Sequence, residues 1–174
     1  MTFATNHPAP EVVVTDTNVL INFLHLAQLP LLGSMCSYRC AVPNQVVDEI
    51  TRESQALALA ASFECRHIDR CDTDDSATRD LFADLCTRIE IGEAACIAIA
   101  FMRGHLVATD EKKHAKRIAI EMLGERRLLR TEDVIWRCVE EGLITIPEAD
   151  AFKARLAELR YVMDFSSFAD MEPA

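Results

Sequence analysis

The sequence contains no Lys or Arg before Arg39, so the basic start that a secretory signal peptide requires is missing. It also contains no apolar stretch that is long and uninterrupted enough to span a membrane. The seven cysteines include no Cys-x-x-Cys pair, and such an odd, scattered set is typical of reduced thiols. These absences predict a cytoplasmic protein that has no membrane partner.

Several catalytic signatures are missing as well. The sequence has no Walker phosphate-binding loop, no Gly-x-Gly-x-x-Gly segment and no Ser-His-Asp order of a serine hydrolase. Cys65, His67 and Cys71 are residue types that bind zinc, but their spacing fits no common structural zinc site. Nucleotide-loop and serine-hydrolase chemistry therefore have no support, and a zinc site has little.

The chain has 174 residues, of which 50% are hydrophobic, and this is enough for one domain with a sizeable core. Its net charge of −10 argues at first against a nucleic acid partner. Between residues 112 and 130, however, only two residues are acidic, Glu121 and Glu125. Seven residues of the same segment are basic, namely Lys112, Lys113, Lys116, Arg117, Arg126, Arg127 and Arg130. Such a patch can hold a polyanion, although a solvated helix face explains the same charges.

Apolar runs alternate with helical patterns along the chain. We expect strands at about 11–15, 38–42, 63–70, 105–109 and 127–130, and helices at about 18–29, 43–61, 75–88, 93–103, 111–123, 131–141 and 146–160. Pro30 is expected to stop the first helix, Asp74 or Asp75 to cap the third, and Thr131 and Thr145 to cap the last two. Strands separated by helices of this length predict parallel βαβ units and an α/β fold.

Two acids follow the buried strands directly. Asp16 comes after Val12–Thr15, and Asp110 comes after Leu106–Thr109. Open α/β sheets bind their ligands beyond the carboxyl ends of the strands. Glu49 and Glu93 lie on helices that can join the two acids there. One like-charged pair about 4 Å apart costs roughly 4 kcal/mol at an effective dielectric constant of about 20, and a hard divalent cation relieves that repulsion. The sequence therefore predicts a phosphodiesterase that depends on Mg²⁺ or Mn²⁺.

Each acid also has a simpler explanation. Asp16 and Asp110 can be helix caps, and Glu93 stands in a first helical turn, where the helix dipole favours an acid. Glu49 can be an acid that faces solvent, and Asp48 competes with it as the candidate. The prediction depends on the order and context of all four acids together. Asn18 and Thr109 are candidate supporting residues, which can orient an acid or a water.

Four segments together resemble the PIN-domain nucleases, whose toxin members are the VapC-type ribonucleases. The segments are VVVTDTNVLI around Asp16 and Asn18, VPNQVVDEI around Glu49, IGEAACIAIA around Glu93, and LVATDEKK around Asp110 and Glu111. The resemblance covers residues 11–160. It leaves a polar, flexible segment at 1–10 and a tail at 161–174. It implies a three-layer α/β/α PIN-like domain with a central parallel sheet, a bound Mg²⁺ or Mn²⁺, and RNA as substrate. It also implies an antitoxin partner and a homodimer.

The resemblance assigns roles to these acids. Asp16, Glu93 and Asp110 would hold the metal, while Glu49 would ligate it or position a water. Many relatives have a further Asp a few residues later, where this chain has Lys113 and His114. Glu111 can substitute, or Asp110 can act through a water. Phosphates flanking the cut would be held by Lys112, Lys113, Lys116 and Arg117.

Two rival functions fit part of the pattern. A phosphatase of the haloacid-dehalogenase kind also places an Asp after its first strand, but it requires a second Asp where this chain has Asn18. A PIN-like binding or scaffold module needs no catalysis, although the presence of all four acids argues against it. The tail, with Phe165 and Phe168, can fold back over the basic patch, support a dimer, or remain a partly ordered terminus.

Overall fold

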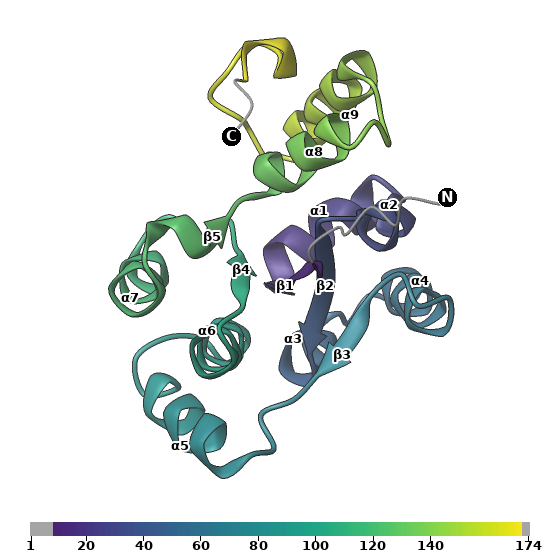
Figure 1. The fold of residues 1–174 in the computed structure, drawn as a ribbon. Coiled ribbons are helices and arrows are strands. Elements are labelled where there is room, and N and C mark those ends of the chain that lie inside the picture. The colour runs from purple at the N-terminus through teal and green to yellow at the C-terminus, as the bar shows by residue number, and fades with distance from the viewer. Residues whose placement is uncertain (1–8, 172–174) are drawn as a thin grey trace, which may run out of the picture.

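The computed structural model describes residues 9–171 and builds them around one sheet (Figure 1). The strands are β1 (Glu11–Thr15), β2 (Tyr38–Pro43), β3 (Asp69–Cys71), β4 (Leu106–Ala108) and β5 (Leu128–Leu129). Their order is β3-β2-β1-β4-β5, and every pairing is parallel. Val14, in the central strand, is level with Ala41 on one side and Val107 on the other. The carboxyl ends of β1 and β4 therefore meet at one edge.

Helices cover both faces of the sheet. They are α1 (Thr17–His25), α2 (Leu29–Ser34), α3 (Asn44–Glu49), α4 (Glu53–Glu64), α5 (Ser76–Leu85), α6 (Ile91–Arg103), α7 (His114–Leu123), α8 (Thr131–Glu140) and α9 (Ile146–Glu158). Two short 3-10 helices, Glu125–Arg127 and Phe168–Asp170, complete the described part. Figure 1 shows α5, α6 and α7 on one side of the sheet and α1 and α2 on the other. The predicted three-layer α/β/α fold is confirmed.

Helix α6 forms the centre of its layer because it is apolar on nearly every side. All residues from Ala94 to Ala100 are buried, and the helix packs on β1, β2 and β4. Its small alanines let the helix lie close to the strands, as a helix buried all round requires. Gly104, with φ of 71°, ends it in the left-handed conformation that glycine adopts without strain. The position of α6 fixes Glu93 at the carboxyl edge of the sheet.

Two of the expected helices are each divided in the structure. The expected helix at 18–29 ends at His25, and Pro30 lies in the first turn of α2 instead of stopping α1. A proline fits the first turn because the amide hydrogen that it lacks has no partner there. The expected helix at 43–61 is interrupted at Ile50, whose ψ of 83° is not helical. Glu49 therefore ends a short helix instead of lying inside a long one.

Other boundaries differ by several residues. Strand β3 occupies 69–71 rather than 63–70, and α7 begins at His114 rather than 111, so residues 109–113 form a loop. Thr131 is the first residue of α8, and its predecessor Arg130 stands at the cap. The caps predicted at Asp75 and Thr145 are confirmed, because each side chain accepts a hydrogen bond from the backbone N–H three residues later.

The described part of the tail packs against α9. Phe168 is fully buried, and its ring lies 5.0 Å from that of Phe165 in an edge-to-face arrangement. The carboxylate of Asp150 in α9 accepts hydrogen bonds from the Ser167 hydroxyl and the Phe168 N–H, at 2.7 and 2.8 Å. All seven cysteines are free thiols. Within residues 9–171, no helix is long and apolar enough to cross a membrane.

Candidate active site

Asp16 lies between β1 and α1, at the carboxyl edge of the sheet. Its backbone N–H donates to the carbonyl of Ala108 at 2.9 Å, which extends the β1–β4 pairing by one residue. Only 3% of Asp16 is exposed, and the Thr109 hydroxyl donates to its Oδ2 at 3.2 Å. Burial, with smaller contributions from the negative charges of Glu49 and Asp110, raises the pKa of Asp16 to about 6. Through this bond Thr109 can orient the Asp16 carboxylate, which is the supporting role expected of it.

Glu93 lies in the first turn of α6 and shares a small pocket with Asp16, Thr109 and Cys96. Desolvation is the largest cause that raises its pKa to about 7, and the charges of Asp16 and Glu111 add to the effect. The negative charge of Asp16 therefore disfavours ionisation of Glu93. The structure brings Asp16 and Glu93 together, as the sequence predicts.

Glu49 fastens the start of α6. Its Oε1 accepts from the Gly92 N–H at 3.1 Å, and its Oε2 accepts from the Thr17 hydroxyl. A Cβ atom at Gly92 would lie 2.6 Å from Oε1, so a glycine is required for this close approach. Glu49 thus connects α3 with α1 and with the helix that carries Glu93. Asp48, the competing candidate, is exposed.

Asp110 lies at the same edge, but its carboxylate is surrounded by hydrogen-bond donors. Oδ1 accepts from the Thr131 N–H at 3.0 Å and from the Tyr161 hydroxyl at 2.6 Å. Oδ2 accepts from the Asn22 amide at 3.0 Å and from the Thr131 hydroxyl at 2.7 Å. Asp110 therefore joins α1, α8 and the segment after α9.

A second pocket of about 290 Å³ opens beside Glu93. Acidic, basic and amide side chains line it, and they come from α1, α6, α7 and the segments before α6 and α7: Asn18, Arg88, Glu90, Glu93, Glu111, Lys113 and His114. The predicted residues Asn18, Glu111 and Lys113 are thereby placed near Glu93, and His114 lies beside them. Arg88 was not predicted, because a single Arg in a connecting segment carries no pattern that would mark it.

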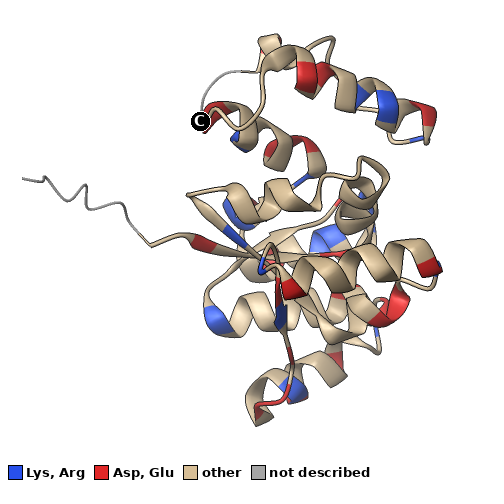
Figure 2. Ribbon diagram, turned by 90° about the vertical axis from the view of Figure 1, so that its right-hand side faces the viewer, with Lys and Arg blue, Asp and Glu red and all other residues tan. Residues whose placement is uncertain are grey.

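The basic patch predicted at 112–130 divides into two groups. Arg127 donates to the carbonyls of Ala100 and His105, and Arg130 pairs with Glu132, so both serve the fold. Lys112 and Lys113 are exposed and Lys116 is half-buried, and none of the three pairs with an acid within residues 9–171. Arg117 contacts His114 and lies 4.0 Å from Glu121. Figure 2 shows the basic and acidic residues interspersed along the ribbon.

Asp16 and Glu93 suit a hard cation, because they offer carboxylate oxygens in a confined place where their own charges are unfavourable. Within the described residues, no group of three or more His, Cys, Asp or Glu side chains is arranged closely enough to hold a metal ion. The reason is local, since Glu49 and Asp110 both direct their oxygens to donors from other elements. The four-acid ligand set stays a prediction.

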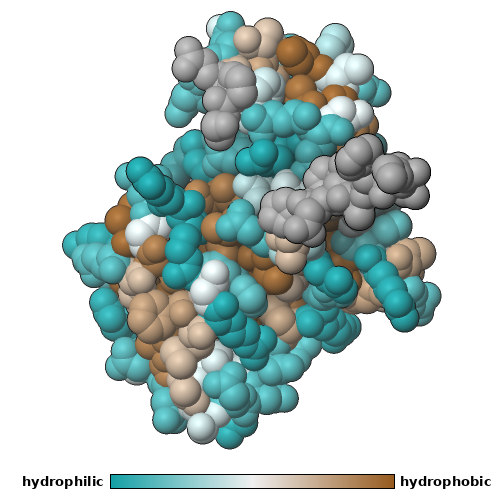
Figure 3. Space-filling model, in the orientation of Figure 1, coloured by the Kyte–Doolittle hydropathy of each residue, from teal (hydrophilic) through white to brown (hydrophobic). Residues whose placement is uncertain are grey.

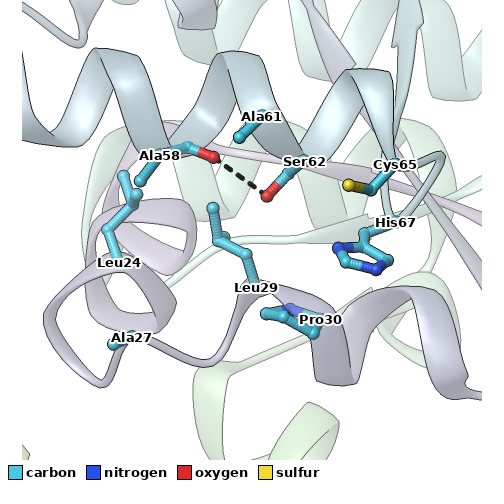
Figure 4. A pocket seen from close by; sticks show the side chains of 9 residues that line it. All are labelled: Leu24, Ala27, Leu29, Pro30, Ala58, Ala61, Ser62, Cys65 and His67. Carbon is cyan, nitrogen blue, oxygen red and sulfur yellow. Dashed lines mark hydrogen bonds between the residues drawn. The ribbon is translucent and has the colours of Figure 1, made fainter.

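An apolar pocket lies apart from these acids (Figure 4). It has a volume of about 280 Å³ and lies between the α1–α2 connection and α4. Leu24, Leu29, Pro30 and Ala58 line it, with Cys65 and His67 at one end. The pocket contains no carboxylate and adjoins the end of α1 that is opposite Asp16, so it has no part in the acidic site.

The fold and its acidic edge define the class: a three-layer α/β/α domain whose buried carboxylates lie beyond the ends of parallel strands. Residues 12–161 match a family model described as a PIN domain. The chain therefore belongs to the PIN-domain family, whose members are generally nucleases. No curated protein matches the chain in sequence.

Proposed function

We propose that this protein is an endoribonuclease that depends on Mg²⁺ or Mn²⁺ and hydrolyses RNA phosphodiester bonds. The observation that carries the proposal is the pairing of Asp16 and Glu93 in one pocket at the carboxyl edge of the sheet. Two carboxylates whose ionisation is unfavourable there would be stabilised by a divalent cation. The family match supports hydrolysis of nucleic acid, and it leaves the phosphatase alternative without support.

The side chains of the site have distinct tasks in this proposal. Asp16 and Glu93 would hold the ion, and Thr109 keeps the Asp16 carboxylate in place through its hydroxyl. When bound, Mg²⁺ or Mn²⁺ supplies positive charge that polarises a phosphate oxygen and makes a water more acidic. Glu49 fixes the helix turn that carries Glu93.

RNA would be held by the basic side chains around the second pocket. Lys113 and His114 line it on one side and Arg88 on another, so a phosphate next to the cut can be bound within reach of Glu93. Lys112, Lys116 and Arg117 would bind phosphates farther along the strand. The acids in the same pocket would repel RNA until a cation neutralises them. Binding of RNA and of metal should therefore support each other.

A non-catalytic PIN-like binding module is the second candidate. It is favoured by the absence of a three-acid group within residues 9–171, and by the hydrogen bonds that engage Glu49 and Asp110. Such a module would bind RNA and leave it intact with any metal present. The same assay therefore separates the two candidates.

The test is cleavage of a mixed RNA pool by the purified protein with Mn²⁺, with Mg²⁺ or with EDTA. We expect cleavage with either metal and none with EDTA. Asp16→Asn should reduce the rate at least 100-fold, since one lost transition-state contact costs about 3 kcal/mol. Asp48→Asn, a change of an exposed acid nearby, is the matched control and should cleave at the wild-type rate. RNA binding without cleavage under every condition would establish the binding module instead.

Two finer proposals come from the family resemblance, namely a toxin role with an antitoxin partner, and a homodimer. The large apolar side chains that are exposed within residues 9–171 bear on both, and they are Leu57, Ile91, Phe101, Met102, Leu159 and Val162. They are distributed over α4, α6 and the segment after α9, and the face in Figure 3 has apolar areas between hydrophilic ones. The molar mass in solution, measured with and without RNA, tests the dimer.

A further inference from the structure

The carboxylate of Asp110 is enclosed by hydrogen-bond donors. An ionised carboxylate offers about four lone-pair positions. Thr131 donates to it through both its N–H and its hydroxyl, Asn22 donates one hydrogen bond, and the Tyr161 hydroxyl, whose single hydrogen is shared between Asp110 and Glu132, lies against the remaining position. These donors come from positions 88, 21 and 51 residues away in the sequence, so the arrangement is tertiary. A metal could bind Asp110 only after one of these bonds had broken.

Tyr161 is well suited to stay in this network as a donor. Its hydroxyl lies between the carboxylates of Asp110 and Glu132. Burial, followed by the charge of Asp110, raises the pKa of Tyr161 above its ordinary value, so the phenol keeps its proton. Glu132 is itself buried and pairs with Arg130 at 2.5 Å. The network thus connects the segment after α9 and the first turn of α8 to the end of β4.

Glu111, the next residue, points to a different environment. Its Oε1 accepts from the backbone N–H groups of Lys112 and Lys113, each at 2.9 Å. It lines the pocket of about 290 Å³ together with Glu93. The two neighbouring acids therefore have different surroundings, because Asp110 faces the C-terminal helices while Glu111 faces the Glu93 pocket.

We propose that Asp110 is a positioning residue rather than a metal ligand, and that Glu111, which shares a pocket with Glu93, is the neighbouring acid that supports metal binding there. Asp110 fixes the short segment from Thr109 to Glu111, so that Thr109 meets Asp16 and Glu111 meets the pocket. Tyr161 and Thr131 hold Asp110 in that orientation. The inference rests on the proposed metal-dependent function, and it makes the C-terminal segment a part of the site.

Mn²⁺ affinity provides the first test, measured from the spectrum of free Mn²⁺ by electron paramagnetic resonance. Asp16→Asn and Glu111→Gln should weaken binding at least tenfold. Asp110→Asn and Tyr161→Phe should change it less than threefold, as should the control Asp48→Asn. Asp110→Asn with a loss as large as that of Asp16→Asn would overturn the inference. So would tighter binding in Tyr161→Phe, because a freed Asp110 oxygen would then be competing for the ion.

Cleavage kinetics provide the second test. The rate lost in Glu111→Gln should be recovered by excess Mn²⁺, whereas the lower kcat of Asp110→Asn and Tyr161→Phe should persist at saturating metal. Tyr161→Phe keeps every charge and serves if Asp110→Asn does not fold. An Asp110→Asn variant that excess Mn²⁺ restores would contradict the positioning role.

A third measurement separates this inference from the proposed function. If Asp16→Asn binds Mn²⁺ as well as the wild type, the metal-dependent function fails. Thermal unfolding then still decides the anchoring role: Asp110→Asn and Tyr161→Phe should each lower the melting temperature, and the double variant should lose less than the sum. Additive losses would show that the two side chains act independently, and the network would be refuted.

Discussion

At the scale of single residues, the site combines two acids that the protein holds against their tendency to ionise. Asp16 is almost completely buried, and its pKa of about 6 lies above the ordinary value of 3.8. Glu93 has a pKa of about 7 for the same first reason, loss of water. Strongly shifted pKa values of this kind cluster at binding and catalytic sites. They have a measurable consequence for stability.

Asp16 and Glu93 make the stability of the metal-free protein depend on pH. A carboxyl group whose pKa is raised in the folded state is protonated there while the unfolded chain has already ionised. The contribution of these two groups is therefore largest below about pH 4 and is lost as the pH rises through about 6 and 7. For Asp16 the shift from 3.8 to about 6 corresponds to roughly 3 kcal/mol.

Urea unfolding in EDTA at pH 4.5 and pH 8 measures this difference. Asp16→Asn should remove the part that Asp16 contributes, and Mn²⁺ should restore stability at pH 8 to the wild type but not to Asp16→Asn. Asp48→Asn serves as the control and should keep the wild-type dependence. An Asp16→Asn variant with the same difference between the two pH values as the wild type would show that the Asp16 carboxyl group is not strained.

Gly92 and Glu49 form a pair that a double-mutant cycle can resolve. In the wild type, Gly92→Ala places a methyl group 2.6 Å from the Glu49 Oε1 atom, so the end of this flexible side chain must shift away from the residue 92 N–H, at a cost of about 1 kcal/mol. In a Glu49→Ala background the crowding is gone. The same change should then be neutral or stabilising by up to about 1 kcal/mol, because Ala favours a helix over Gly. An equal cost in both backgrounds would mean that Glu49 is not what requires a glycine.

The sequence identifies some of these residues and not others. Asp16 and Glu93 are predictable, because one follows a buried strand and the other opens an apolar helix, and both features are local. The partners of Asp110 are not, since Tyr161 lies 51 residues away and only the packing of α8 and α9 brings it near. Arg88 was missed for a similar reason. Residue type at a strand end predicts a position, whereas hydrogen-bond saturation depends on tertiary structure.

At the scale of secondary-structure elements, the strands and the parallel order follow from apolar runs, while the helix breaks do not. The division between α3 and α4 occurs at Ile50 and the next two residues, none of which is Gly or Pro. Ile50 is buried in the core, and burying its side chain favours leaving the helical path there. Propensity favours one continuous helix across this point, but packing places Glu49 at a helix end.

The loop before α7 carries the lysines whose role is still to be measured. Changing Lys112, Lys113 and Lys116 together to Gln should weaken RNA binding. It should also reduce the slope of log affinity against log salt by up to about 2, since each phosphate contact on a single strand contributes about 0.7. The measurement is fluorescence anisotropy of labelled RNA, with a cleavage-defective protein, at several salt concentrations.

A matched control changes three exposed basic residues elsewhere on the protein, namely Arg52, Arg79 and Arg155, to Gln. Its affinity and salt slope should stay close to those of the wild type. If both triple variants lose the same slope, the binding follows overall charge. The three lysines would then belong to an ordinary solvated face.

At the scale of the whole molecule, the C-terminal segment forms part of the folded body. Phe168→Ala should lower the free energy of unfolding by about 3–5 kcal/mol, because the ring is fully buried against α9. Phe101→Ala, where the side chain is 45% exposed, is the matched control and should cost about 1 kcal/mol or less. Urea unfolding of both variants makes the comparison. Similar losses in the two would mean that residues 161–171 contribute little to stability.

The two outermost strands, β3 and β5, are three and two residues long. An incoming chain that added itself to the sheet would find few unpaired backbone groups at either margin, and at β3 it would meet the charged Asp69 and Arg70. Short edge strands, one of them charged, oppose the addition of a further strand, which is the first step of many aggregation pathways. Any self-association of this protein should therefore use helix surfaces, and its intersubunit contacts should be made by side chains rather than by a shared sheet.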